Sequence, residues 1–96
     1  MRAYHMRVQV ADAAQAEALT EALAALGPVV VQRQERTVAL LWPGLEADDP
    51  DEWDEQTFAE LVFFLRAWSG RDPRRELIVL EERPIEVPAQ VFRRAS

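Results

Sequence analysis

The chain has 96 residues with a formal net charge of −6 at pH 7, and its 49% hydrophobic and 29% charged residues are typical of a globular protein. Such a length suits a single domain over residues 1–96, and a negative net charge repels the phosphates of nucleic acids, so we expect no nucleic-acid partner. The sequence lacks cysteine, which excludes disulfides and thiolate metal sites. No apolar run approaches the roughly 20 residues that cross a bilayer, so we expect a cytoplasmic protein without a membrane partner.

The first element is a predicted strand over residues 3–10, where apolar and polar side chains alternate. One face of this strand carries Tyr4, Met6, Val8 and Val10, and the other carries His5, Arg7 and Gln9. Such alternation is typical of a strand that buries one face against a core and leaves the other face open.

A helix is predicted over residues 13–26. Asp12 stands three residues ahead of Gln15 and has the form of an N-terminal cap, with aspartate in place of the usual serine or threonine. Apolar residues then recur at helical spacing, at Ala16, Leu19, Leu23 and Leu26. Gly27, followed by proline, is expected to end the helix.

Two short strands follow, over residues 29–34 and 37–42, and the two residues between them predict an antiparallel hairpin. Alternation assigns the bulkier side chains to the buried face, namely Val29, Val31, Val38, Leu40 and Trp42. The opposite face, which the helices would leave open, then carries Val30, Ala39 and Leu41 among polar neighbours.

A second helix is predicted over residues 50–68, with Asp49 as its N-cap. Its apolar residues form a stripe wide enough to face both the sheet and the first helix, made of Trp53, Thr57, Phe58, Leu61, Val62, Phe64, Leu65 and Trp68. Phe63 lies outside this stripe. It is either an isolated exposed residue, which is ordinary, or it contacts a partner chain or is covered by Val91 and Phe92 of the C-terminal tail.

The last predicted strand covers residues 76–83, and residues 84–96 form a tail that two prolines hold extended. The order strand, helix, strand, strand, helix, strand predicts the α+β class, as a ferredoxin-like βαββαβ sandwich with its core in about residues 3–83. Its four-stranded antiparallel sheet has the order 4-1-3-2 and carries both helices on one face. This fold hosts many functions and implies none by itself.

The acidic run Asp48–Glu55 surrounds the start of the second helix. It fails the pattern of a calcium loop, because Trp53 occupies a position that needs an oxygen ligand. Carboxylates also suit the positive end of a helix dipole, and a docking patch for a basic partner is a further interpretation. The sequence has no glycine-rich phosphate loop and no nucleophile that can be paired with a base, so we predict no metal, no cofactor and no catalytic residue.

These patterns favour a non-catalytic interaction or regulatory module that self-associates, most simply as a twofold homodimer. A small domain with an uncovered sheet face commonly buries that face against another chain. The interface candidates are the apolar residues expected on the surface, Val30, Ala39, Leu41 and Phe63, together with either Ile78 and Leu80 or Leu77 and Val79 of the last strand.

Two alternatives stay open. The first is a small enzyme of the dimeric α+β barrel kind, with a pocket between sheet and helices lined by Tyr4, Trp42 and Phe64 and served by His5. The second is a small-metabolite sensor, although the turn after the first strand lacks the glycine that would let a ligand approach the backbone. A closed polar cavity beside His5 would favour the enzyme, and a flat apolar face would favour the module.

Overall fold

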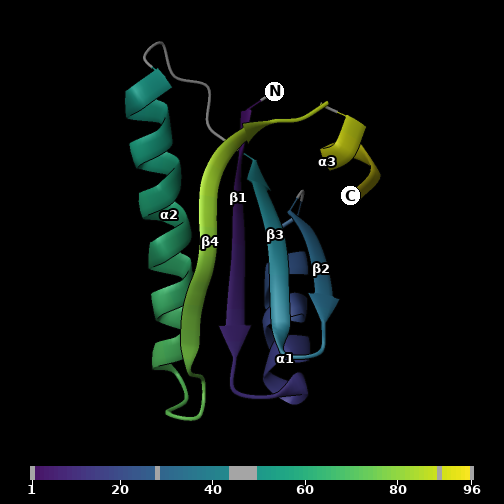
Figure 1. Cartoon of the computed structure of the whole chain (residues 1–96), viewed down its shortest axis with the longest axis vertical. Helices are drawn as coiled ribbons and strands as arrows, with labels where there is room; N and C mark the ends of the chain where they lie inside the picture. Colours follow the sequence, from purple (N-terminus) through teal and green to yellow (C-terminus); the bar gives the residue numbers. More distant parts are fainter. Residues whose placement is uncertain (1, 28, 44–49, 89, 96) are drawn as a thin grey trace.

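The described part of the chain contains four strands and three helices (Figure 1). The computed structural model describes residues 2–27, 29–43, 50–88 and 90–95, without the side chains of residues 50–54 and 93–95. The elements are β1 Arg2–Val10, α1 Ala13–Ala24, β2 Val30–Gln34, β3 Thr37–Pro43, α2 Pro50–Gly70, β4 Leu77–Glu86 and α3 Gln90–Ala95. No helix within the described residues is long and apolar enough to cross a bilayer.

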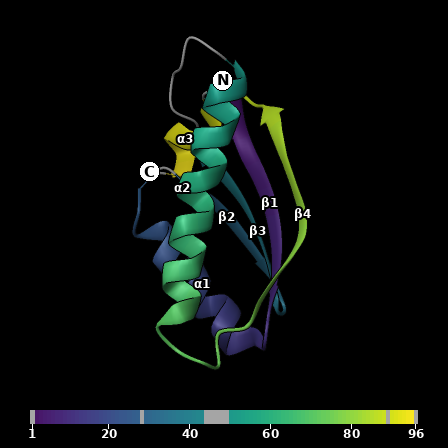
Figure 2. The same ribbon diagram turned by 90° about the vertical axis from the view of Figure 1, so that its left-hand side faces the viewer.

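The strands form one antiparallel sheet in the order β2-β3-β1-β4. This is the predicted order 4-1-3-2 read from the other edge, so the α+β class and the sheet order are confirmed. Helices α1 and α2 lie on one face of the sheet, and the other face is open (Figure 2). The two edges differ, because α3 contacts β2 whereas α2 lies beside β4 (Figure 1).

The register of the strands turns the predicted apolar face toward the helices. Met6 of β1 lies opposite Leu40 of β3, and Val8 lies opposite Val38, and none of the four is more than 1% exposed. Because opposite residues of an antiparallel pair share a face, these partners form one layer of the core. The helices complete this core with Ala16, Leu19, Leu23, Leu61, Leu65 and Trp68.

Helix α1 begins where it was predicted and ends earlier. The Oδ1 atom of Asp12 accepts a hydrogen bond of 2.8 Å from the backbone N–H of Gln15, which confirms the N-cap. The helix ends at Ala24, and Gly27 turns the chain with a φ of +103°, a conformation that glycine adopts most easily. Leu26 therefore lies beyond the end of the helix and is 45% exposed, so the predicted helix end at residue 26 was wrong.

Helix α2 begins at Pro50, as predicted, and continues to Gly70. Its predicted apolar stripe is buried at Thr57, Leu61 and Leu65, which are 0%, 0% and 3% exposed. The proposed cap Asp49 and the side chain of Trp53 lie outside the described part of the chain. The helical periodicity thus identified the face of α2 that packs on the sheet.

The C-terminal segment differs from the extended tail predicted for it. Strand β4 continues to Glu86, and α3 forms over residues 90–95. Helix α3 contacts β2, and its Phe92 is only 5% exposed. A helix this short is unstable alone, so burial of Phe92 stabilises it. Since α3 and α2 lie at opposite edges of the sheet (Figure 1), the tail does not cover Phe63, which is 76% exposed, and that alternative is excluded.

Candidate self-association surface

The open face of the sheet brings together three of the predicted interface residues. Leu41 of β3 lies opposite Val30 of β2, and Ala39 points to the same face two residues earlier in β3. All three are half-buried within a single chain. These three residues therefore expose less apolar surface on the open face than the alternation in the sequence predicted.

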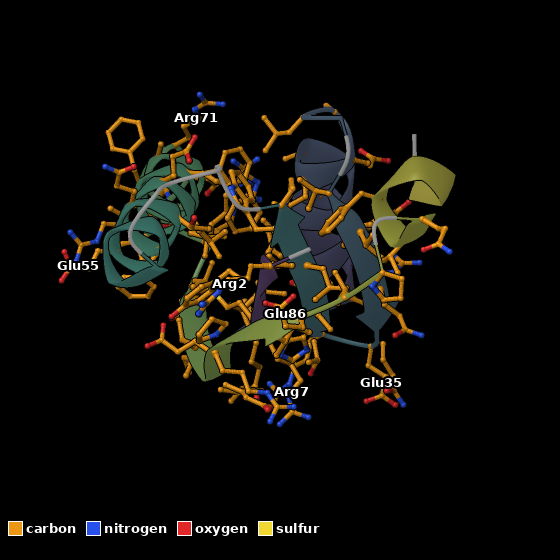
Figure 3. All side chains as sticks on the ribbon, turned by 90° about the horizontal axis from the view of Figure 1, so that it is seen from above. Arg2, Arg7, Glu35, Glu55, Arg71 and Glu86 are labelled. Carbon is orange, nitrogen blue, oxygen red and sulfur yellow. The ribbon has the colours of Figure 1, made fainter. Side chains whose placement is uncertain are left out.

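Charged side chains occupy the centre of the same face. Arg7 of β1 lies opposite Glu81 of β4, and their side chains form an ion pair of 3.8 Å. Arg83 approaches the same carboxylate at 3.6 Å. Arg7 points away from the helices (Figure 3) and also borders a polar hollow of about 400 Å³, lined by Arg7, Gln32, Arg33, Gln34, Glu35, Thr37 and Ala39. This face is charged around its apolar cluster, and it is not the flat apolar face expected of an interaction module.

A β-bulge in the edge strand β4 decides which of its apolar residues face the helices. Arg7 pairs with Glu81 and the next residue, Val8, pairs with Val79, so Leu80 is an extra residue between them. The sequence left two assignments open for this strand. The register places Leu77 and Val79 on the helix side, whereas Ile78 lies on the open side.

Three consecutive apolar residues of β4 remain exposed, and we call Ile78, Val79 and Leu80 the β4 edge patch. Their exposed fractions are 57%, 45% and 44%. Val79 is exposed although it lies on the helix side, beside Val8, which is fully buried. Helix α2 therefore does not cover the edge strand as completely as the helices cover β1.

A groove separates α2 from the strands at this edge. Its volume is about 360 Å³, and it is lined by Met6, Phe58, Val62, Leu65, Arg66, Ser69, Leu77, Val79 and Glu82. Most of these side chains are apolar, and the polar ones are Arg66, Ser69 and Glu82. The groove adjoins the β4 edge patch through Val79, so an apolar surface continues from the strand edge toward the space beneath α2.

The aromatic residues of the predicted enzyme pocket, Tyr4, Trp42 and Phe64, each make a ring contact on the helix side. The ring centroids of Tyr4 and Phe58 are 5.6 Å apart, and those of Trp42 and Phe64 are 6.0 Å apart. His5 follows Tyr4 in β1, so its side chain points to the open face. The structure thus places His5 on the opposite side of the sheet from the residues with which the enzyme hypothesis combined it.

The turn between α2 and β4 is held by arginine side chains. The guanidinium of Arg75 lies 4.6 Å from the ring centroid of Trp68 and donates a hydrogen bond of 3.0 Å to the carbonyl oxygen of that residue. The Asp72 carboxylate accepts hydrogen bonds from the side chain of Arg74, at 2.8 and 3.1 Å, and from its backbone N–H at 2.9 Å. These contacts fix the point at which the chain enters the edge strand.

The pKa of Asp72 provides a test of this turn. Hydrogen bonds from the Arg74 side chain, followed by that from its backbone N–H, lower the pKa of Asp72 from 3.8 to about 2. A carboxyl with a lowered pKa stabilises the fold at pH values above 3.8, and this contribution disappears as the pH falls toward 2. We expect carbon NMR titration of the Asp72 carboxyl to give a midpoint near 2, which Arg74→Ala shifts toward 3.8. Arg71→Ala should leave the midpoint unchanged, and an equal shift in both variants would contradict this assignment.

No group of three or more histidine or carboxylate side chains that could hold a metal ion is found among the described residues. Most of the acidic run that was weighed as an ion site or docking patch, from Asp48 to Asp54, lies outside the described side chains.

No protein-family model matches the chain, and neither a curated protein nor a solved structure matches it.

Proposed function

We propose that this protein is a non-catalytic interaction or regulatory module that self-associates, most simply as a twofold homodimer. The observation that carries the proposal is the β4 edge patch, three consecutive apolar residues that are 57%, 45% and 44% exposed. An edge strand presents unpaired backbone groups, and natural proteins commonly protect such edges with charge, proline or a covering segment. In β4 the charged residues Glu81 to Arg83 and Pro84 give this protection after the bulge, whereas the residues before the bulge are apolar. An apolar stretch of edge beside an apolar groove is typical of a surface that another chain covers.

We further infer a ferredoxin-like sandwich, extended by α3. The inference is supported by the order of the elements from β1 to β4 and by the sheet order β2-β3-β1-β4, with α1 and α2 on one face. Because this fold supports enzymes, sensors and dimerisation modules alike, it does not choose between the functions considered for the chain.

The positions of two residues favour the module over the alternatives. The enzyme hypothesis combined His5 with Tyr4 and Trp42, yet the latter two face the helices and His5 faces the open side. The sensor hypothesis requires a ligand at the turn after β1. There, the carboxylate of Asp12 accepts a hydrogen bond from the backbone N–H of Gln15, in the first turn of α1, where an anionic ligand would bind.

The proposal predicts a dimer at micromolar concentration. Sedimentation equilibrium should give a mass of twice 11.0 kDa for most of the protein once its concentration exceeds a dissociation constant of about 1 μM, which corresponds to about −8 kcal/mol. A single species of 11.0 kDa up to about 100 μM would overturn the proposed function, because such an affinity would be weaker than about −5.5 kcal/mol.

A further inference from the structure

Helix α3 covers one of the two edges of the sheet. The strand order β2-β3-β1-β4 makes β2 and β4 the edge strands, and α3 contacts β2. Seen from the side and from above, α3 lies at the β2 edge, at the opposite end of the sheet from α2 (Figures 1 and 3). A covering segment is one of the ways in which natural proteins keep an edge strand from pairing with other chains.

The hydrogen bonds of the hairpin identify the backbone groups that the β2 edge presents. The N–H of Val10 donates a hydrogen bond of 2.9 Å to the carbonyl oxygen of the residue before Thr37, so Thr37 directs its own N–H and C=O away from β1. These groups face Gln34, which lies opposite Thr37 in β2. Because the direction alternates along a strand, the N–H and C=O groups of Val31 and Arg33 point outward from the sheet. An added strand would pair with these outward groups.

One buried side chain anchors α3 at this edge. Phe92 is 5% exposed, whereas Gln90 is exposed and Val91 is half-buried. The hydrophobic cluster that the described residues form between sheet and helices, which includes Met6 and Leu40, does not include Phe92. Because a helix of six residues is too short to be stable by itself, the docking of α3 depends on this separate contact. Loss of the contact would release α3 and leave the main core intact.

We propose that α3 is a detachable cover, and that its release lets β2 pair antiparallel with β2 of a second copy. The contact of α3 with β2 is autoinhibitory, because α3 and an incoming strand occupy the same edge. With the twofold axis at Gln32, Val31 of each copy lies opposite Arg33 of the other, so the outward groups of both strands gain partners at once. This cover lies at the edge opposite to the β4 edge patch, so its role does not depend on the proposed function.

The first test removes the anchor from the full chain. Phe92→Asp places a charge at a buried position and should release α3, whereas Phe63→Asp is the matched control at a phenylalanine that is 76% exposed. We expect sedimentation velocity to show Phe92→Asp in larger assemblies than the unmodified chain at the same concentration, because the uncovered β2 edge adds a contact. Phe63→Asp should sediment like the unmodified chain. Larger assemblies in neither variant, or in both, would overturn the proposal.

Hydrogen exchange followed by NMR distinguishes release of α3 from general unfolding. In Phe92→Asp, the amides of α3 should exchange about tenfold faster or more, whereas those of the central strand β1 should keep their rates. Equal acceleration in β1, or loss of the cooperative melt in circular dichroism, would show that Phe92 supports the main core, and this result would overturn the detachable cover.

A second variant tests whether β2 is the edge that associates. Arg33→Pro removes one of the outward N–H groups, which the sheet itself does not use, so the variant should fold. Combined with Phe92→Asp, it should return the assemblies to the size of the unmodified chain. Larger assemblies that persist in the combined variant would place the new contact elsewhere and overturn the pairing of β2 with β2.

Discussion

Replacing Leu40 by arginine should abolish the cooperative fold. Leu40 is 1% exposed and lies opposite Met6, which is fully buried, in the layer between sheet and helices. An unpaired charge at this position costs several kcal/mol, out of a total stability of about 5–15 kcal/mol for a domain. Circular dichroism should show that the sigmoidal thermal transition of the unmodified protein is lost in Leu40→Arg.

The matched control is Leu41→Arg, one residue along the same strand. Leu41 is half-buried on the open face, opposite His5 and Val30, so an arginine there can reach water. We expect this variant to melt cooperatively and, because the proposed self-association surface is the β4 edge patch, to remain a dimer. A folded but monomeric Leu41→Arg would move the interface to the open face, and an unfolded Leu41→Arg beside a folded Leu40→Arg would contradict the strand register.

The second large effect is expected at Leu61 of α2. Its side chain is fully buried beneath the helix, so Leu61→Ala removes apolar contacts and leaves a cavity in the core. Substitutions of this kind lower the free energy of unfolding by about 2–5 kcal/mol. Urea unfolding followed by circular dichroism should show a lower midpoint with an unchanged dependence of the free energy on urea concentration.

Phe63→Ala provides the comparison on the same helix. Phe63 is 76% exposed, so its truncation should change the free energy of unfolding of the monomer by no more than about 0.5 kcal/mol. A loss at Phe63 comparable to that at Leu61 would mean that α2 presents a different face to the sheet.

Short-range patterns predicted the parts of the fold that depend on neighbouring residues. The alternation in β1 identified Met6 and Val8 as buried, because successive side chains of a strand point to opposite faces. Asp12 was identifiable as a cap because its carboxylate reaches the N–H of Gln15 within the first turn of α1. The arrangement of these strands in one sheet followed from their order and from the short hairpin between β2 and β3.

Elements stabilised by distant contacts were not predicted. Leu26 continues the helical spacing of α1, and the pattern alone did not reveal that the helix ends at Ala24. Helix α3 has no strong signal of its own, because so short a helix depends on packing, here the burial of Phe92 at the edge of the sheet formed by β2.

The sequence by itself determined that Leu77–Leu80 is an apolar run with charged residues on both sides. It did not determine which of these side chains face the helices, since an unbroken apolar run carries no alternation. The tertiary structure decided which side chains face the helices through the pairing of β4 with β1, where the extra residue Leu80 shifts the register. The position of α2 then leaves Val79 exposed, although this residue lies on the helix side. Register and helix placement depend on packing between segments far apart in the chain, and a local pattern does not encode such contacts.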